Sequence, residues 1–294
     1  MSRRILAWTK ITPVMLLAVG CQAGAGRTGR VVQIGTTKAD LFGVPAEYRA
    51  LHMDLEKKFN CPVSFSAQPS GTAIGQQLDM GNVPFAVLTA EEYAEVEDAS
   101  KLTLLASGVN SLGKTSRQAH IVVRANSHVK TISDCAGKRF AFGAYKDPLT
   151  DIAARKALEQ AGVPMKKILP EILPPPLAFE GRLYVSPAKS WFDLTVNAGV
   201  IDEIDFNKMP ESGGNPITGP SKDQFKIVGE TAAIPEIVVV AGPSADPQMA
   251  ETLKNYLLND AKANEKLCQD LKITGFAPAD RAAYDAVKPV FAKS

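Results

Sequence analysis

Apolar and polar residues follow two different periods along the chain, and their order predicts strands and helices in turn. Residues 31–35 ("VVQIG") form a short apolar run that ends in glycine, which is typical of a buried strand. In residues 45–59 the apolar positions recur at helical spacing, and residues 61–68 alternate as a strand does. Residues 70–81 begin with a hydroxyl at the cap position and end in Gly81, which indicates a helix. Residues 83–89 ("VPFAVLT") predict the next strand.

A second series of alternating strands and helices begins near residue 119. It contains the strand-like runs "AHIVVRANS" and "KRFAFG", a helix from Pro148 and an apolar helix expected at 192–199 ("FDLTVNAG"). Residues 170–191 are rich in proline and predict an extended loop. A pair of strands interrupted by Pro235 follows, and two amphipathic helices are expected at 247–271 and 278–294. Alternating strands and helices predict an α/β protein with mostly parallel sheets flanked by helices.

The length of 294 residues suits two lobes, each with its own core. Two α/β rounds followed by a return of the chain predict lobe 1 over residues 31–117 plus 237–294 and lobe 2 over residues 118–236. Ligands of such folds lie between the lobes, at the carboxyl ends of the strands. Lobe closure would occur by a hinge motion near Gln118 and Glu236.

The N-terminus has the pattern of an export signal. Arg3, Arg4 and Lys10 precede an apolar run that is too short to span a bilayer, and Cys21 follows at once. "LLAVGC" resembles a bacterial lipobox, which implies a signal peptide at 1–20 and a lipid on Cys21. The alternative interpretation is a twin-arginine export signal in place of the general export signal. Residues 21–30 are rich in glycine and predict a flexible tether. Either route places the folded part outside the cytoplasmic membrane.

Charge and residue types exclude several classes of function. The net charge of +2 becomes about −1 without the three basic residues of the signal, so nucleic acid is not an expected partner. The three histidines are scattered and no nucleophile motif is present, which argues against a metal site, a cofactor or an enzyme. Cys61, Cys135 and Cys268 remain after Cys21, and they allow either one disulfide or three buried thiols.

One turn raises a question of function. Residues 140–143 read as the end of a strand, and an amphipathic helix starts just after Asp147-Pro148. Helix N-termini at such a place often hold anions. However, Asp at the cap with Pro in the first helical position is a self-satisfied helix start. The turn therefore either contributes Lys146, Asp147 and Thr150 to a ligand or only caps its own helix.

The order and spacing of several segments resemble the phosphate- and phosphonate-binding lipoproteins and periplasmic proteins of ABC transporters. The matching segments are "FGVPAEYRALHMDLEKKFNCPV", "LDMGNVPFAVLTAEEY", "IVVRANSHVKTISDCAGKRFAFG", "VNAGVIDEIDF" and "ETAAIPEIVVVAGPSADPQ". The resemblance implies the two-lobed type 2 periplasmic-binding fold over nearly all of the mature chain. It also implies a small-molecule solute and the membrane subunits of an ABC permease as partners.

The resemblance also implies where a ligand would bind, and the chain departs from the family there. After "AFG" the family usually reads D-P-x-S-T-S-G, and the S-T-S positions fall here on Asp147, Pro148 and Leu149. The family's Ser-His pair in lobe 2 is replaced by Ala188 and Lys189, so Lys189 is a candidate for the lost positive charge. Hydroxyl and aromatic residues expected to line the cleft from lobe 1 are Thr37, Ser70, Thr89 and Tyr93.

The expected function is that of a substrate-binding lipoprotein that captures a phosphate- or phosphonate-like oxyanion and delivers it to a permease. The altered turn leaves a zwitterionic or neutral solute open. The alternative is a sensor or scaffold lipoprotein of the same fold that has lost or changed ligand binding.

Overall fold

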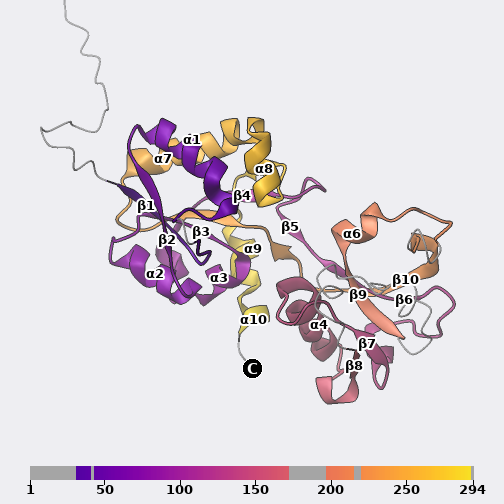
Figure 1. Ribbon diagram of the computed structural model, residues 1–294. Helices are drawn as coiled ribbons and strands as arrows, with labels where there is room; N and C mark the ends of the chain where they lie inside the picture. The colour runs from indigo at the N-terminus through magenta and orange to yellow at the C-terminus, as the bar shows by residue number, and fades with distance from the viewer. Residues whose placement is uncertain (1–30, 41–42, 172–196, 215–219, 293–294) are drawn as a thin grey trace, which may run out of the picture.

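The computed structural model describes residues 31–40, 43–171, 197–214 and 220–292. Within them the chain forms two lobes side by side, each built on its own sheet (Figure 1). A membrane-spanning helix, which would need both length and an apolar composition, does not occur in these ranges. The expected signal, the tether with Cys21 and the segment with Lys189 lie outside the described residues.

The first lobe contains a six-stranded mixed sheet in the order β13-β4-β12-β3-β1-β2. β1 pairs in parallel with β2 and β3, whereas β12 and β13 run antiparallel to their neighbours β3 and β4. The strands are β1 (Val32–Thr36), β2 (Val63–Ala67), β3 (Phe85–Leu88), β4 (Thr103–Val109), β12 (Val238–Ala241) and β13 (Gly275–Ala277).

Helices cover both faces of this sheet (Figure 1). Successive residues of β12 show the two faces, because Val239 packs into one hydrophobic cluster and Val238 and Val240 pack into the other. One face is covered by α1 (Arg49–Phe59), α7 (Pro247–Asn255) and α8 (Glu265–Leu271), and the opposite face by α2 (Gly71–Asp79), α3 (Ala90–Glu95) and α9 (Arg281–Ala286).

The second lobe contains a five-stranded mixed sheet in the order β10-β6-β9-β7-β8. β7 pairs in parallel with β9 and β8, whereas β6 is antiparallel to β9 and β10. Its elements are β6 (Ala119–Arg124), β7 (Arg139–Ala141), a π-helical segment (Pro148–Ala153) that continues as α4 (Ala154–Gln160), β8 (Leu169–Glu171), β9 (Ala198–Asp202), α6 (Glu203–Lys208) and β10 (Phe225–Glu230).

Two short strands and the C-terminal helix connect the lobes. β5 (Ser116–Arg117) pairs antiparallel with β11 (Ile234–Pro235) between the two sheets. α10 (Lys288–Phe291) carries Val290 into the core of the second lobe, although this segment belongs to lobe 1 in the expected division. The expected boundaries at 117/118 and 236/237 fall at the crossing strands, and the division itself stays a prediction.

The two-lobed α/β class is as expected, and three details differ. Both sheets are mixed rather than mostly parallel, because return strands pair antiparallel in each. Residues 198–199 of the expected helix "FDLTVNAG" lie in strand β9, since a short apolar run does not distinguish a buried strand from a helix. The expected helix at 247–271 is broken near Asn264, whose side chain accepts a hydrogen bond from the Leu267 N–H and starts α8 anew.

Candidate functional site

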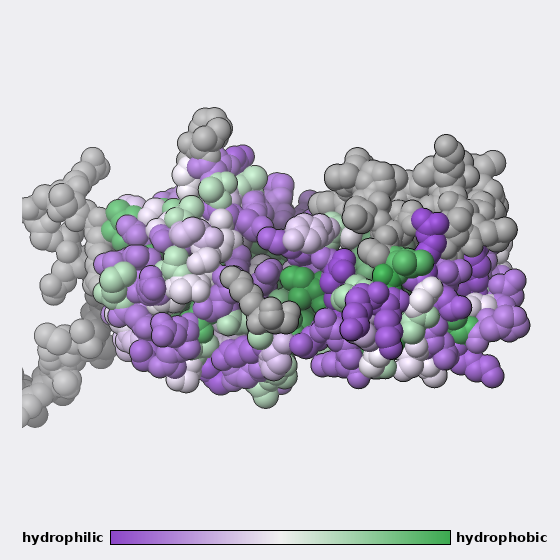
Figure 2. Space-filling model, turned by 90° about the horizontal axis from the view of Figure 1, so that it is seen from below, coloured by the Kyte–Doolittle hydropathy of each residue, from purple (hydrophilic) through white to green (hydrophobic). Residues whose placement is uncertain are grey.

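A cavity of about 950 Å³ lies between the two lobes. The second lobe contributes the turn after β7 and the junction of β9 with α6, and the first lobe contributes the end of β4, α8 and the start of β13. Charged lining residues from the second lobe include Lys146, Asp147, Asp202 and Asp205, and those from the first lobe include Lys262 and Lys272. The side of the molecule shown in Figure 2 is largely hydrophilic, with apolar residues in small separate groups. The charged side chains that both lobes contribute to the cavity suit it to a polar solute.

The turn before Pro148 is held rigidly by its own side chains. Asp147 Oδ1 accepts hydrogen bonds from the N–H groups of Leu149 (3.1 Å) and Thr150 (2.7 Å) and from Thr150 Oγ1 (2.8 Å). Lys146 has a left-handed backbone (φ 64°), and its N–H donates to Asp151 Oδ2 at 2.8 Å. The Asp147 carboxylate therefore caps its own helix, and the same turn holds Tyr145 83% exposed at the cavity.

The hydroxyl residues expected from the first lobe also have partners within the chain. Thr37 Oγ1 donates to the Glu92 carboxylate. Thr89 and Glu92 form a capping box, in which the Thr89 N–H donates to Glu92 Oε2 (2.8 Å) and the Glu92 N–H donates to Thr89 Oγ1 (3.2 Å). Ser70 Oγ accepts from the Ala73 N–H at 3.2 Å and caps α2. All three residues thus stabilise the local structure at the carboxyl ends of β1, β2 and β3.

Glu95 occupies the N-terminus of α2. Its Oε2 accepts a hydrogen bond from the Gly71 N–H at 2.8 Å, and its backbone carbonyl accepts one from Thr72 Oγ1 at 3.0 Å. A side chain of α3 thereby fills the place where the free N–H groups of α2 would otherwise meet solvent or a ligand.

Tyr93 is a packing residue in this structure, which corrects its expected place in the cleft. Its side chain is fully buried, and its hydroxyl donates to Asp285 Oδ1 (3.3 Å) and accepts from Arg281 Nη1 (3.2 Å). Its ring contacts Tyr284 with the ring centroids 5.3 Å apart. The residue thus anchors α9 to α3 rather than facing a solute.

Carboxylates gather where α3 meets the second lobe. Ala90, the first residue of α3, packs into the second lobe's hydrophobic core. Burial raises the pKa of the neighbouring Glu91, and the negative charges of Glu95 and Glu92 raise that pKa further. The negative charge of Asp147, in the second lobe, also raises the pKa of Glu91, whereas the positive charge of Lys146 lowers it.

Replacing Glu91 by glutamine is expected to stabilise the protein near pH 7 but not near pH 4. A carboxyl whose pKa is higher in the folded state binds its proton more tightly there, so stability falls as pH rises from the ordinary pKa through the raised one. The loss of stability caused by Glu91 is complete at pH values above its raised pKa. Thermal unfolding at both pH values should show a gain of up to about 0.5 kcal/mol at pH 7 only. The exposed Glu251→Gln is the control, and an equal gain at both pH values would contradict the assignment.

An ion-pair network lies at the crossing strands. Arg117 pairs with Asp202 Oδ2 (3.1 Å) and Glu236 Oε1 (3.7 Å), and Asn110 Nδ2 donates to Glu236 Oε1 at 3.1 Å. Burial raises the pKa values of Asp202 and Glu236, and the Arg117 charge opposes that rise. A second pair joins Lys114 Nζ to Glu203 Oε2 at 2.8 Å. These contacts link the segment before β5 to the start of α6.

The expected site residues fall into three groups. Lys146, Asp147 and Thr150 line the cavity, whereas Thr37, Ser70, Thr89 and Tyr93 do not. Lys189 lies outside the described residues. Arg117, Asp202 and Asp205 line the cavity and were not expected. Asp202 is a polar residue at the end of the apolar strand β9. Because ligands of such folds bind at the carboxyl ends of strands, this pattern in the sequence could have identified Asp202 as a cavity residue.

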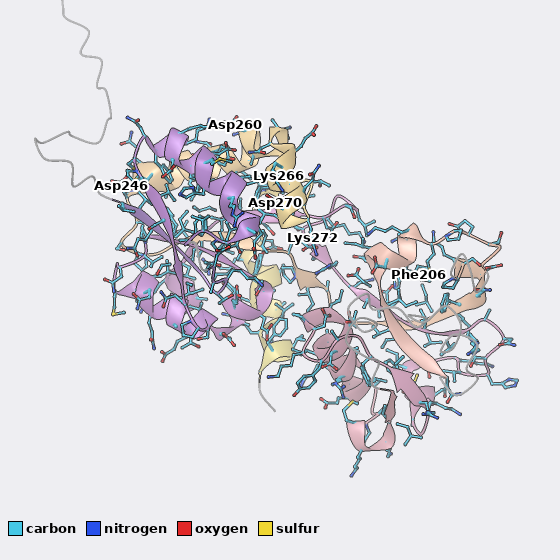
Figure 3. All side chains as sticks on the ribbon, viewed as in Figure 1. Phe206, Asp246, Asp260, Lys266, Asp270 and Lys272 are labelled. Carbon is cyan, nitrogen blue, oxygen red and sulfur yellow. The ribbon has the colours of Figure 1, made fainter. Side chains whose placement is uncertain are left out.

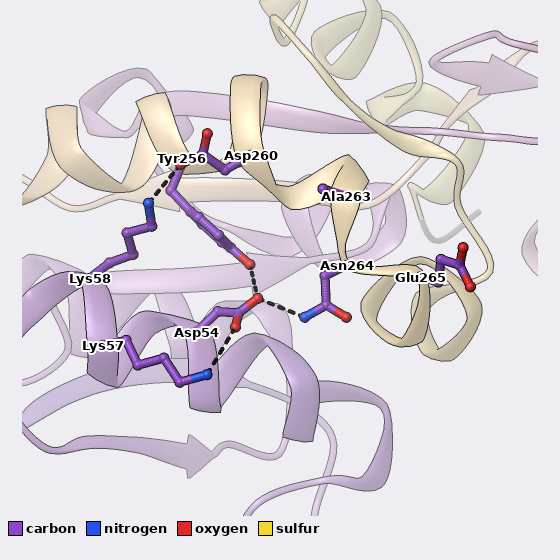
Figure 4. Close-up of a pocket in the computed structure, with 8 residues that line it drawn as sticks. All are labelled: Asp54, Lys57, Lys58, Tyr256, Asp260, Ala263, Asn264 and Glu265. Atoms are coloured by element: carbon purple, nitrogen blue, oxygen red, sulfur yellow. Dashed lines mark hydrogen bonds and ion pairs between the residues drawn. The ribbon is translucent and has the colours of Figure 1, made fainter.

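A second pocket lies on the first lobe between α1, the π-helical segment Tyr256–Asp260 that follows α7, and the start of α8 (Figure 4). Its volume is about 530 Å³, and its polar groups bind one another. Asp54 Oδ2 accepts from Tyr256 Oη (2.6 Å) and Asn264 Nδ2 (2.7 Å), and Lys58 pairs with Asp260 (2.7 Å). These contacts hold α1 against the segment between α7 and α8, so the pocket is less suited to a ligand than the inter-lobe cavity.

Neither a disulfide nor a metal site is found at either pocket among the described residues. No disulfide joins Cys61, Cys135 and Cys268 to one another, and burial raises the pKa of the Cys135 thiol to about 11. Within the described ranges, no group of His, Cys, Asp and Glu side chains is arranged to hold a metal ion.

A model of the family described as "ABC transporter, phosphonate, periplasmic substrate-binding protein" matches residues 44–284. The structure is similar to that of a Xanthomonas citri protein bound to chloride ion (17% identity, 89% of this chain and 96% of that chain covered, TM-score 0.60). It is also similar to PhnD1 from Prochlorococcus marinus in complex with methylphosphonate (14% identity, 88% and 96% covered, TM-score 0.54). A search of curated proteins finds no match. At these identities the structural similarity establishes the fold, which is the two-lobed type 2 periplasmic-binding fold.

Proposed function

Because the chain belongs to the family of periplasmic substrate-binding proteins of phosphonate ABC transporters, we propose that it captures a small solute between its lobes and delivers it to a membrane permease. The observation that carries the proposal is the inter-lobe cavity, to which both lobes contribute charged and polar side chains. The connection through β5 and β11 consists of short strands, which is the geometry in which a hinge closes two lobes around a ligand.

The protein acts in this proposal as a binder at the outer side of the cytoplasmic membrane. The lipobox-like sequence before Cys21 supports export and anchoring through a lipid on that cysteine. The absence of a nucleophile motif in the sequence is consistent with a binder rather than an enzyme.

A second candidate function is that of a sensor or scaffold lipoprotein with the same fold. The observation that favours it is that Asp147 caps the helix N-terminus at which the family resemblance places the oxyanion. A solute in that case would be bound elsewhere in the cleft or not at all.

A thermal-shift screen of the purified protein tests the proposal. The panel contains phosphate, phosphite, methylphosphonate, aminoethylphosphonate, sulfate, amino acids and polyamines. A solute at a hundred times its Kd should raise the free energy of unfolding by about 2.7 kcal/mol. Small-angle X-ray scattering with that solute should show a smaller radius of gyration, because the lobes close. If no member of the panel stabilises the protein, the sensor or scaffold function is favoured.

A further inference from the structure

We propose that Tyr145 is a specificity-determining residue of the inter-lobe cavity, and that its ring packs against a planar apolar group of the solute. Lys146 and Lys272, one from each lobe, hold the anionic group of the same solute. The inference deepens the proposed solute-binding function and rests on it. It assigns the solute to the class of organic anions that carry an aromatic or other planar group.

Tyr145 is the one aromatic residue among the described residues that line the cavity, and it is 83% exposed. Aromatic side chains expose a large apolar area, and binding sites use them to contact the apolar parts of ligands. The exposure of Tyr145 is an exception in this chain. The other tyrosines in the described ranges are all buried: Tyr48, Tyr93, Tyr256 and Tyr284. An uncovered ring in the cavity wall therefore indicates a surface that a solute covers.

The backbone around Tyr145 is fixed before any solute binds. The Asp147 N–H donates to the Ala144 carbonyl oxygen at 2.9 Å, so Tyr145 and Lys146 form the tip of a turn. The Lys146 N–H donates to Asp151 Oδ2 at 2.8 Å, which anchors the same tip to the following helix. A solute that packs on the ring thus does not have to order the backbone that carries it.

A lysine from each lobe lines the cavity in a backbone conformation that favours glycine. Three non-glycine residues in the described part of the chain are left-handed, and two of them are Lys146 (φ 64°) and Lys272 (φ 55°). Lys272 directly follows α8, where glycine is the usual residue. Figure 3 shows Lys272 on the side of the first lobe that faces the second. Residues in this conformation gather at functional sites, so both positions support a role for the lysine side chain.

The carboxylates of the cavity wall do not neutralise these lysines. Asp202 pairs with Arg117 at 3.1 Å. Asp205 pairs with Lys208 at 3.5 Å. Across the described residues, the charged lining groups that form neither an ion pair nor a helix cap are three lysines and one glutamate: Lys146, Lys262, Lys272 and Glu265. The charge that is left for a solute is therefore mainly positive, which suits an anionic group.

The cavity is also large enough for an organic anion. Its volume of about 950 Å³ lies in the upper part of the range of about 300–1,000 Å³ that is typical of sites for drug-sized ligands. Leu149, Ile204 and Ile273 line it together with Tyr145 and add apolar surface from both lobes. A lone tetrahedral oxyanion would use neither the volume nor the ring.

Calorimetric titrations with methylphosphonate and phenylphosphonate test the inference, because the two probes share a head group and differ in the aromatic ring. Wild-type protein should bind phenylphosphonate at least about fivefold more tightly than methylphosphonate. Tyr145→Ala should reduce this preference to less than about twofold, whereas Tyr145→Phe keeps the ring and should retain it. Comparing the ratio between proteins cancels the difference in charge and solvation between the probes.

Two further variants serve as controls. Leu169→Ala removes an exposed apolar side chain of the same lobe that is not part of the cavity lining, and it should change neither affinity. Lys272→Gln should weaken the binding of both probes by about fivefold or more and leave their ratio unchanged, because this lysine holds the head group that they share. Tyr145 is exposed, so Tyr145→Ala should fold, which its melting temperature checks.

Four results would overturn the inference: wild-type protein that binds neither probe or binds both equally, a preference that survives in Tyr145→Ala, a preference lost in Leu169→Ala, and unchanged affinity for both probes in Lys272→Gln. Failure of the proposed function is a different result, in which no solute of the screen and neither probe binds. Equal binding of the two probes would support solute capture while refuting the role of Tyr145.

Discussion

Replacing Gly71 by alanine is expected to lower the free energy of unfolding by about 3 kcal/mol, which is at the upper end for overpacking of a dense interior. A Cβ atom at this position would lie 2.0 Å from the backbone carbonyl oxygen of Glu92, and a backbone atom moves only if α3 shifts. Helix propensity alone predicts the reverse, since alanine is favoured over glycine by up to about 1 kcal/mol. The close approach of the two helices outweighs that gain.

Urea denaturation of Gly71→Ala measures the loss directly. Gln76→Ala on the same helix is the control, because Gln76 is exposed and its replacement should change stability by less than about 0.5 kcal/mol. A Gly71→Ala protein that is as stable as the wild type would show that α2 and α3 are not in close contact. The same contact between α2 and α3 sets Glu95 against the Gly71 N–H.

Removing the Tyr284 hydroxyl is expected to cost about 2 kcal/mol, although Tyr284→Phe leaves the ring in place. The residue is 1% exposed, and its hydroxyl donates to the Glu236 carbonyl at 2.8 Å and lies 2.7 Å from Ser107 Oγ. The phenylalanine would leave a buried carbonyl and a buried serine hydroxyl without this partner. The melting temperature should fall by about 5 °C.

Calorimetry of Tyr284→Phe checks this value, with Tyr145→Phe as the control. Tyr145 is 83% exposed, so loss of its hydroxyl should leave the melting temperature unchanged. Equal, small effects of the two substitutions would mean that water replaces the Tyr284 hydroxyl at Glu236. Glu236 follows β11 directly, so a large effect of Tyr284→Phe would show that α9 supports the crossing strands.

Local features of the helix starts could be predicted from the sequence. The caps at Ser70, Thr89 and Asp147 each join a side chain to an N–H group two or three residues further on, so the residue types and their spacing suffice to identify them. The Asp147 side chain caps its helix as the residue types indicate, and because Lys146, Asp147 and Thr150 also line the cavity, a ligand-binding role of the turn stays a prediction. The family was recognised from the order of many weak segments, and the match over residues 44–284 confirms it.

Contacts between distant parts of the chain could not be predicted in this way. Thr37 and Glu92 are 55 residues apart, and Tyr93 and Asp285 are 192 residues apart. Tyr93 was expected to face the cleft because it matches an aromatic residue that lines the family's site, but its place on α3 turns it toward α9. The strand at residues 198–202 was partly read as a helix, since only pairing with β6 and β7 distinguishes the two.

The sequence by itself determined the alternation of strands and helices, the helix caps and the family, because these depend on residue types within a few positions of one another or on their order. The tertiary structure alone decided which charged groups of distant segments meet: Glu95 at the start of α2, and Arg117 between Asp202 and Glu236 at the crossing strands. The physical reason is that such contacts depend on how sheets and helices pack, and a pattern along the chain does not contain the distances between elements.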